Sequence, residues 1–404
     1  MRTEIADKRW AKKYPHVGTG PVSAEPCVSR EYFELERERV FRKVWLNVGR
    51  VEEVATPGDY VVRDLIACNA SVLVVRGKDG ELRAFHNVCS HRGNKLVWNE
   101  KGTCPGILSC GFHAWSYNTK GELAWVPDEE NFFDLPKARL GLTSIALDIW
   151  QGFIFINLDP HPQETLREYL GGVAEELGGG QFDRFRLTYN YNVDERANWK
   201  IALDAQNELY HLPFQHRLTL PNFCVMKDNR YTRLLDVRLH GHHSVYASEM
   251  PERSKATMPG QSTATPIQSL VGKINAGSAE YRLPVIGDFS FYTIFPNFVI
   301  LLFKGSSQDF YMTYNFWPQA VDRTTWDIKL YFPAVEHAGQ QLSYEYSKCL
   351  VRDALHEDAI AHEAIHTGLA SRAKKELFFQ DDEIQIRYFH EVLEKIVGPY
   401  AEAR

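Results

Sequence analysis

The stretch from Cys89 to Trp115 constrains the chain more than any other part of its sequence. It holds two cysteines and two histidines in two mixed pairs, Cys89-x-His91 and Cys110-x-x-His113. Both pairs lie at the expected tips of hairpins, because the neighbouring runs are rich in β-branched and aromatic residues and are broken at turns. Thiolates and imidazoles are the ligands that soft and borderline metals prefer, so these four residues predict a metal site.

Two kinds of centre are compatible with these ligands. A tetrahedral zinc ion is the simpler interpretation, but zinc fingers usually group cysteine with cysteine and histidine with histidine. A [2Fe–2S] cluster in which two histidines replace two cysteines on one iron requires mixed pairs, and its neutral imidazoles raise the reduction potential. We therefore expect an electron-carrying cluster. Cys104 lies between the pairs and is an alternative ligand, although no histidine follows it at the same spacing.

Composition excludes several other classes of protein. The 404 residues, 44% hydrophobic and 24% charged, are ordinary for a globular protein of two or three domains. A net charge of −6 argues against a nucleic-acid partner, and no apolar run approaches the ~20 residues that span a membrane. The first residues lack the apolar core of a signal peptide, and seven cysteines at scattered spacings form no disulfide framework. We expect a cytoplasmic protein with no nucleic-acid or membrane partner.

The order of expected elements predicts an α+β chain in three parts. Residues 1–45 are a helical segment, with Ser29 as a helix N-cap, that we expect to pack on the C-terminal domain. Residues 46–165 contain strands and turns, and residues 166–404 contain strands followed by helices. No GxGxxG follows a strand, so the sequence shows no nicotinamide or flavin site.

A second group of metal-binding side chains lies between residues 198 and 216. Glu208, His211 and His216 form the pattern Glu-x-x-His-x-x-x-x-His, and the first two would share one face of a helix. Pro213 separates the histidines, so the helix must break or widen there before both imidazoles reach one ion. Two histidines and one carboxylate make the facial triad of non-haem Fe(II) oxygenases. The alternative is two unrelated histidines satisfied by hydrogen bonds.

The carboxylate of such a triad is expected on the helix predicted over residues 353–373. Asp358 lies on the same helical face as an apolar stripe formed by Leu355, Ile365 and Leu369. A carboxylate on a buried face is costly unless it is paired or bound to a metal. We therefore favour Asp358, with Asp353 as the second choice.

The other titratable side chains near these motifs are expected to have structural roles. Glu357 and Glu363 point away from the apolar stripe and should be solvated. His362 and His366 are expected to be core or surface residues, and the histidines in "LHGHH", residues 239–243, to lie on a surface loop.

These motifs resemble those of the α subunits of Rieske non-haem iron oxygenases, the ring-hydroxylating oxygenase family. "CSHRGNKL…CGFHAWSYNTKGEL" is similar to C-x-H-R-G, C-x-x-H-x-W and G-x-L. "NWK…ELYHLPFQH" resembles the mononuclear-iron motif, and "HEDAIAHEAIHTGL" the segment E-D-x-x-x-x-E-x-x-x-x-G-L, whose aspartate is a ligand. Two departures are Ala114, where the family usually has glycine, and Asp204-Ala205, where many relatives have Glu-Asn.

The resemblance implies an all-β Rieske [2Fe–2S] domain and a helix-grip (START-like) catalytic domain around a central antiparallel sheet. It implies cluster ligands Cys89, His91, Cys110 and His113, and ligands of a single Fe(II) at His211, His216 and Asp358. It further implies a head-to-tail homotrimer, with or without a β subunit, in which Glu208 joins His211 to His113 of the adjacent subunit. Electrons would come from NAD(P)H through a separate ferredoxin or flavin reductase.

The function implied is that of a terminal oxygenase component that uses O2 to hydroxylate an aromatic or other hydrophobic small molecule, as in aromatic hydrocarbon catabolism. Hydroxylation of an N- or O-alkyl carbon would end as dealkylation. cis-Dihydroxylation of an arene is the close alternative, and Ala205 in place of asparagine favours the monooxygenase. A Rieske electron carrier or ligand-binding protein without an active iron site is an alternative of another class. Apolar strands and the loop after His216 should line the pocket, with candidates Phe289, Phe291, Phe295, Asn297 and Phe298.

Overall fold

The computed structural model describes residues 9–217, 219–220, 229–249, 282–304, 309–336 and 338–399. The chain forms two compact units: a smaller unit, Arg37–Tyr169, and a larger unit made of Met1–Glu36 and Leu170–Arg404. The N-terminal segment thus belongs with the C-terminal part of the chain. None of the helices in the described residues has the length and apolarity needed to cross a membrane.

The smaller unit is built from two antiparallel sheets around one core. Its seven-stranded sheet has the order β2-β11-β10-β5-β4-β3-β6, formed by β2 (Leu46–Arg50), β3 (Asp59–Leu65), β4 (Ala70–Arg76), β5 (Leu82–His86), β6 (Lys101–Thr103), β10 (Ser144–Trp150) and β11 (Phe153–Asn157). The three-stranded sheet contains β7 (Ile107–Ser109), β8 (Ser116–Asn118) and β9 (Leu123–Trp125). Apolar side chains of both sheets pack together, and Cys89 and Cys110 lie in this core.

The larger unit has a seven-stranded antiparallel sheet of order β12-β18-β17-β16-β15-β14-β13. Its strands are β12 (Phe185–Glu195), β13 (Asp236–His240), β14 (His243–Ser248), β15 (Phe289–Ile294), β16 (Phe298–Phe303), β17 (Phe310–Ala320) and β18 (Arg323–Pro333). The helix α3 (Leu166–Glu176) precedes them in the chain. The expected antiparallel central sheet is therefore present.

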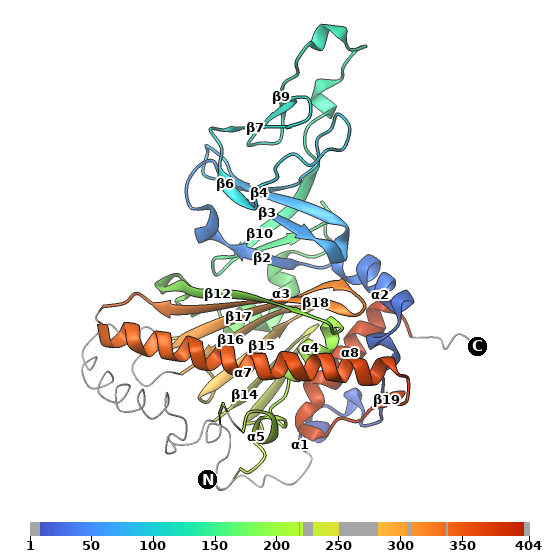
Figure 1. Cartoon of the computed structure of the whole chain (residues 1–404), viewed down its shortest axis with the longest axis vertical. Helices are drawn as coiled ribbons and strands as arrows, with labels where there is room; N and C mark the ends of the chain where they lie inside the picture. The colour runs from blue at the N-terminus through green and yellow to red at the C-terminus, as the bar shows by residue number, and fades with distance from the viewer. Residues whose placement is uncertain are drawn as a thin grey trace. The chain divides into compact units, whose positions relative to one another are not determined.

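One face of this sheet packs against the long helix α7 (Ala338–Ala370), which lies across the strands in Figure 1. Trp326 of β18 contacts His362 of α7 with ring centroids 5.7 Å apart, and Phe332 stacks on Tyr344 at 4.4 Å. Because side chains alternate between the faces of a strand, these pairs identify the face that α7 covers, which we call the inner face.

The N-terminal segment is fixed to the larger unit by pairing and by buried charge. Strand β1 (Val22–Ser23) pairs with β19 (Glu376–Leu377), beyond the end of α7. Helix α1 (Arg9–Lys13) and helix α2 (Arg30–Glu36) are short, and Ser29 Oγ accepts a hydrogen bond from the Tyr32 amide as an N-cap. The C-terminal helix α8 (Ile384–Val397) contacts β14 and α2.

A buried ion pair holds helix α4 (Trp199–Gln206) against α2. Lys200 Nζ lies 2.6 Å from Glu36 Oε1, and Trp199 Nε1 donates to Glu36 Oε2 at 3.0 Å. Both charged side chains are fully buried, and burial raises the pKa of Glu36 despite the opposing charge of Lys200. The pair therefore positions the helix that directly precedes the second predicted site.

Candidate metal centres

The cysteines and histidines of the first motif lie on two neighbouring loops of the smaller unit. Cys89 follows β5, and Cys110 begins the loop between β7 and β8. The two thiols are buried, whereas His113 is exposed and His91 is partly buried. His91 Nδ1 and His113 Nδ1 lie 3.2 Å apart. Cys104 belongs to neither loop, because it follows β6. Two thiols at the inner side and two imidazoles at the outer side fit a cluster with unlike irons.

Backbone hydrogen bonds shape both loops. The Gly93 amide donates to the Cys89 carbonyl at 3.0 Å, and the Ala114 amide donates to the Cys110 carbonyl at 2.8 Å. Gly93 has φ +73° and Ala114 has φ +57°, in the left-handed region where an L residue is less stable by ~1–2 kcal/mol. The family's usual glycine at position 114 therefore has a physical reason, and alanine occupies that position at a cost.

Hydrogen bonds reach both sulfur atoms, although burial raises the pKa of Cys89 and only the pKa of Cys110 is lowered. Although burial opposes it, the backbone amide of Phe112 and the side chain of Asn94 lower the pKa of Cys110. Asn94 Nδ2 lies 3.4 Å from Cys110 Sγ, and the Tyr117 hydroxyl lies 3.3 Å from Cys89 Sγ. Thiolates are the ligand form of cysteine, so this environment fits an iron–sulfur cluster.

The second motif adopts a different local structure from the one predicted. The expected helix over residues 198–211 ends at Gln206, and a second helix, α5, spans Leu212–Gln215. Glu208 and His211 therefore lie on a turn and do not share a helical face. Pro213 does not break a helix, because it stands in the first turn of α5, where its missing N–H is tolerated.

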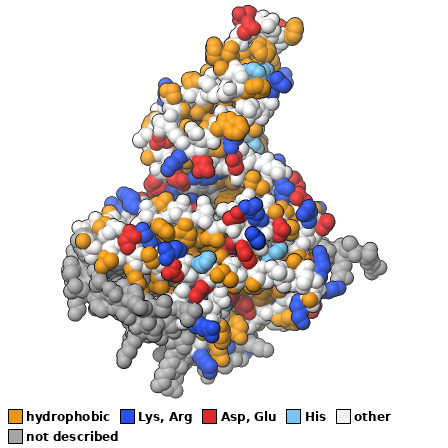
Figure 2. All heavy atoms as spheres, in the orientation of Figure 1, with side chains coloured by type: hydrophobic (Ala, Val, Ile, Leu, Met, Phe, Trp, Pro, Cys, Tyr) orange, Lys and Arg blue, Asp and Glu red, His pale blue; other side chains and the backbone are white. Residues whose placement is uncertain are grey.

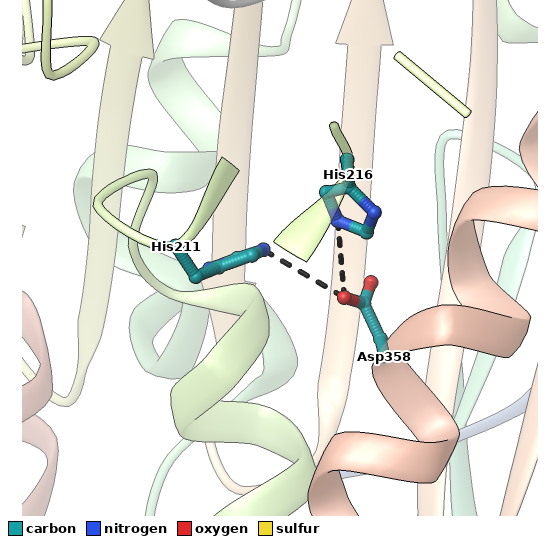
Figure 3. Close-up of side chains that lie close together, drawn as sticks. All are labelled: His211, His216 and Asp358. Atoms are coloured by element: carbon teal, nitrogen blue, oxygen red, sulfur yellow. Dashed lines mark ion pairs between the residues drawn. The ribbon is translucent and has the colours of Figure 1, made fainter. Parts of the chain in front are cut away.

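The turn and α5 bring both histidines to one aspartate of α7 (Figure 3). Asp358 Oδ1 lies 3.0 Å from His216 Nε2 and 3.7 Å from His211 Nε2. One potential ligand atom from each of the three residues lies within 4.8 Å of the others. His216 and Asp358 are buried and His211 is partly buried, so the group is enclosed and can coordinate one ion.

The buried stripe of α7 differs from the predicted one in one turn. Leu355, Asp358, His362 and Leu369 are buried as expected, but Ile365 is 44% exposed and His366 takes its place in the stripe. The second candidate carboxylate, Asp353, is exposed and pairs with Arg352. The position of Asp358 on the buried face thus distinguishes it from Asp353.

Each member of the triad has a polar partner behind it. The Glu208 carboxylate accepts a hydrogen bond from His211 Nδ1 and from the His211 amide, the latter at 3.1 Å. Glu357 Oε2 accepts from His216 Nδ1 at 2.9 Å and from the Thr219 hydroxyl at 2.6 Å. The prediction that Glu357 is solvated is therefore wrong. Glu357 directly precedes Asp358 on α7, but no spacing in the sequence reveals its contact with His216, which is 141 residues away in the chain.

The carboxylates around the two imidazoles favour a positive charge at this place. Although burial alone would lower it, Glu208 and Asp358 raise the pKa of His211 to about 9. The pKa of His216 is also raised. Burial opposes this shift, whereas the hydrogen bonds to Asp358 and Glu357 favour it. The pKa of Asp358 is lowered by the two histidines against the effect of burial. An acidic enclosure with two imidazoles fits a divalent cation held by nitrogen and oxygen ligands.

The predicted pocket side chains do not all lie on one face of the central sheet. Tyr246 of β14 stacks on Phe291 with ring centroids 4.9 Å apart, and its hydroxyl donates to the Gln206 carbonyl at 2.8 Å. Phe289 and Phe291 thus lie on the inner face. Phe298 pairs with Ile294 and points to the opposite face.

The remaining two pocket candidates lie in the connection between β15 and β16. Asn297 Nδ2 donates to the Phe316 carbonyl at 3.0 Å in the β15–β16 connection, and Phe295 contacts Phe389 of α8. The loop after His216 falls largely outside the described residues, which omit 218 and 221–228.

The other histidines have hydrogen-bonded structural positions. His362 Nδ1 lies 3.1 Å from Glu195 Oε2, and His366 Nδ1 accepts from the Asn198 amide at 3.3 Å. His243 is buried in β14, where its Nδ1 accepts from the Phe295 amide at 3.0 Å. The expectation of a surface loop for this histidine is therefore wrong, because the segment forms the β13–β14 hairpin.

Both units of the chain match models of known protein families. The family model described as "Rieske [2Fe-2S] domain" matches residues 44–144, and the model "Ring hydroxylating alpha subunit (catalytic domain)" matches residues 182–398. The chain is 34% identical over 185 residues to a carnitine monooxygenase oxygenase subunit of Acinetobacter baumannii, covering 45% of this chain and 49% of the relative. It is 33% identical over 224 residues to the α subunit of a 2-aminobenzenesulfonate 2,3-dioxygenase of Alcaligenes sp., covering 53% and 54%.

Solved structures share the fold over nearly the whole chain. A quaternary ammonium Rieske monooxygenase has a TM-score of 0.76 at 23% identity and covers 95% of this chain and 97% of its own. Naphthalene 1,2-dioxygenase from Rhodococcus sp. has a TM-score of 0.73 at 21% identity and covers 96% and 98%. By sequence, however, the chain spans about half the length of the curated relatives it matches. The matches to both units identify the chain as a member of the ring-hydroxylating oxygenase α-subunit family, with a Rieske [2Fe–2S] domain and a mononuclear-iron catalytic domain.

Proposed function

We propose that the chain is the terminal oxygenase subunit of a multicomponent monooxygenase whose substrate is a small quaternary-ammonium compound. The observation that carries the enzymatic part is the enclosed group of His211, His216 and Asp358. The substrate class is supported by relatives named carnitine monooxygenase and glycine betaine monooxygenase oxygenase subunits. It replaces the aromatic or other hydrophobic substrate expected from the sequence, which these relatives do not support, whereas the expected dealkylation is compatible with it.

The residues divide the work between the two units. Cys89, His91, Cys110 and His113 would hold the cluster, and His211, His216 and Asp358 the mononuclear iron. When bound, the iron activates O2 and the cluster delivers electrons that reach it from NAD(P)H through a separate ferredoxin or flavin reductase. Glu208 keeps the Nδ1 proton of His211 in place, so that Nε2 is the free nitrogen that faces the ion.

The inner face offers an aromatic surface next to the triad. Tyr246 and Phe291 stack together, and Tyr314 lies 6.3 Å from Phe291 between ring centroids. A trimethylammonium group has no N–H to donate, so aromatic faces are its natural partners. An apolar arene fits such a surface too, and the surface therefore does not by itself select the substrate.

cis-Dihydroxylation of an arene is the second candidate function. The specific observation in its favour is the likeness to the 2-aminobenzenesulfonate 2,3-dioxygenase α subunit. Ala205, which replaces the usual asparagine near the iron, lacks the amide that the resemblance associates with some dioxygenases. We therefore place monooxygenation first.

Turnover with a defined panel tests the substrate class. The full chain, with a surrogate reductase, NADH and O2, is offered carnitine, glycine betaine, naphthalene and 2-aminobenzenesulfonate, and products are identified by mass spectrometry. We expect an oxygenated or N-demethylated product from a quaternary-ammonium compound. A cis-diol from an arene, with no product from the ammonium compounds, would contradict the proposal. His211→Ala is the control for background oxidation.

We also propose that copies of the chain assemble head to tail as a homotrimer. Two exposed aromatic side chains contact the imidazoles of the first site, since Phe112 lies against His113 and Phe132 against His91. Trp125 and Phe133 of the same unit are exposed too, and hydrophobic side chains are visible at the end of this unit that carries β7 and β9 (Figure 2). A second exposed group, Tyr210, Phe214 and Tyr231, lies beside His211. Unlike patches that meet between copies make a heterologous contact, which closes into a ring.

Sedimentation tests this assembly. Phe214→Asp should lower the mass from trimer to monomer and stop multiple-turnover activity, because a charge is placed in the contact. Phe378→Asp is the matched control, since Phe378 is an exposed phenylalanine of the larger unit outside both patches. A fully active monomeric wild-type protein would rule out the proposed assembly.

A further inference from the structure

The side-chain amide of Gln206 donates a hydrogen bond to the oxygen of Asp358 that does not face the histidines. Gln206 Nε2 is 2.9 Å from Asp358 Oδ2, whereas Asp358 Oδ1 is the atom near both imidazoles. A carboxylate only accepts hydrogen bonds, so the amide N–H is the donor. The two oxygens of Asp358 thus have different partners: one faces the place of the ion, and the other is occupied by the protein.

The position of Gln206 is fixed from three sides. It is the last residue of α4, its side chain is buried, and its backbone carbonyl accepts the hydroxyl of Tyr246 from the inner face of the sheet. Its side chain crosses to α7, which carries Asp358. The amide of Gln206 is therefore held by the end of α4 and by the sheet. If the Asp358 carboxylate rotated, the amide would not follow it, and the buried hydrogen bond between them would break.

We propose that Gln206 is a positioning residue that keeps Asp358 a one-oxygen ligand. A carboxylate can bind a metal through one or both oxygens, and each protein atom added to the coordination sphere removes a position for oxygen or substrate. By occupying Oδ2, the amide limits the protein to three ligand atoms, the number that leaves a facial triad open. This inference rests on the proposed metal site.

The test uses Gln206→Met, which keeps the length of the side chain but removes the donor. The full chain, stripped of iron at the triad, is titrated with Co2+, and visible absorption at saturation reports the coordination number, because higher-coordinate Co2+ absorbs more weakly. We expect affinity to fall by about 10- to 100-fold, as for other partners of metal ligands, with weaker visible bands as Oδ2 joins the metal.

Two further variants keep the result interpretable. Gln340→Met is the matched control, because Gln340 is a buried glutamine of the same helix α7, far from Asp358 in the sequence. Gln206→Asn keeps the amide but withdraws it by one methylene, and it should reproduce the change if Gln206→Met does not fold.

The Co2+ titration distinguishes a failure of the role proposed for Gln206 from a failure of the metal site. An unchanged Co2+ affinity and spectrum in Gln206→Met would overturn the proposal, and so would a lower affinity with an unchanged spectrum, which would indicate packing alone. If the wild-type protein binds no Co2+, or if His211→Ala binds it equally well, the metal site itself fails and the proposed function fails with it.

Discussion

The two candidate centres differ in how their ligands are distributed along the chain. Cys89, His91, Cys110 and His113 come from two neighbouring loops, and their hydrogen-bond partners, such as Asn94 and Tyr117, lie in or beside these loops. The triad joins α5 and its preceding turn to α7, and its partners come from α4, from α7 and from the same turn. A local site is specified by its motif, whereas a distributed site depends on the elements that bring its parts together.

The largest effect should separate the two centres. Asp358→Ala removes a triad ligand and leaves both loops of the smaller unit intact. We expect turnover to fall to background while the visible spectrum of the cluster stays unchanged. His113→Ala, in contrast, should change the visible spectrum of the cluster. A loss of both metals in either single variant would show that the centres are not independent.

Loss of the buried ion pair should destabilise the larger unit. Lys200→Met leaves Glu36 buried without its partner, and removing one member of such a pair costs about 3–5 kcal/mol. The matched control is Lys95→Met in the smaller unit, where Lys95 pairs with Asp64 at the surface and the cost should be at most about 1 kcal/mol. Urea unfolding followed by tryptophan fluorescence measures both, and equal losses would contradict the role given to burial.

The carboxylate behind His216 should matter for the triad alone. Glu357→Gln weakens the acceptor of His216 Nδ1, and we expect turnover or iron affinity to fall by about 10- to 100-fold with an unchanged cluster. Glu363→Gln is the control, because Glu363 lies on the same helix and accepts from the Arg196 amide instead. If both variants behave alike, Glu357 has no special place at the site.

The smallest effect concerns the loop of the first centre. Ala114→Gly relieves a positive φ and should stabilise the smaller unit by about 1 kcal/mol. Ala146 lies in strand β10, so Ala146→Gly should destabilise by about 0.5–1 kcal/mol. Loss of the cluster's visible absorbance in urea compares the two, and a destabilised Ala114→Gly would mean that alanine packs usefully there.

The contrast between a local and a distributed site explains how much could be predicted from the sequence. The mixed Cys/His spacing predicted the cluster domain, and burial of a carboxylate on a helical face predicted Asp358. The sequence did not show that α4 ends at Gln206, because Asn207–Tyr210 carries no glycine or proline to mark a break. The roles of Gln206 and Glu357 depend on contacts between α4, α5 and α7, which no local spacing records.

Which side chains line the pocket stays a prediction, for a related reason. Phe289 and Phe298 both lie in apolar strands, but a period of two sends them to opposite faces of the sheet. The hydrogen bond from Tyr246 to α4 and the contacts of β18 with α7 identify which face lies near the triad. A fully buried strand has apolar side chains on both faces. The sequence alone therefore does not show which face meets a substrate.

Iron and acid-labile sulfide, counted per chain in anaerobically purified wild-type protein and in Asp358→Ala, test the central claim most directly. The account predicts about three iron atoms and two sulfides in the wild type, and two of each in the variant. Zinc in place of iron at the Cys/His loops, or an identical iron content in both proteins, would contradict it.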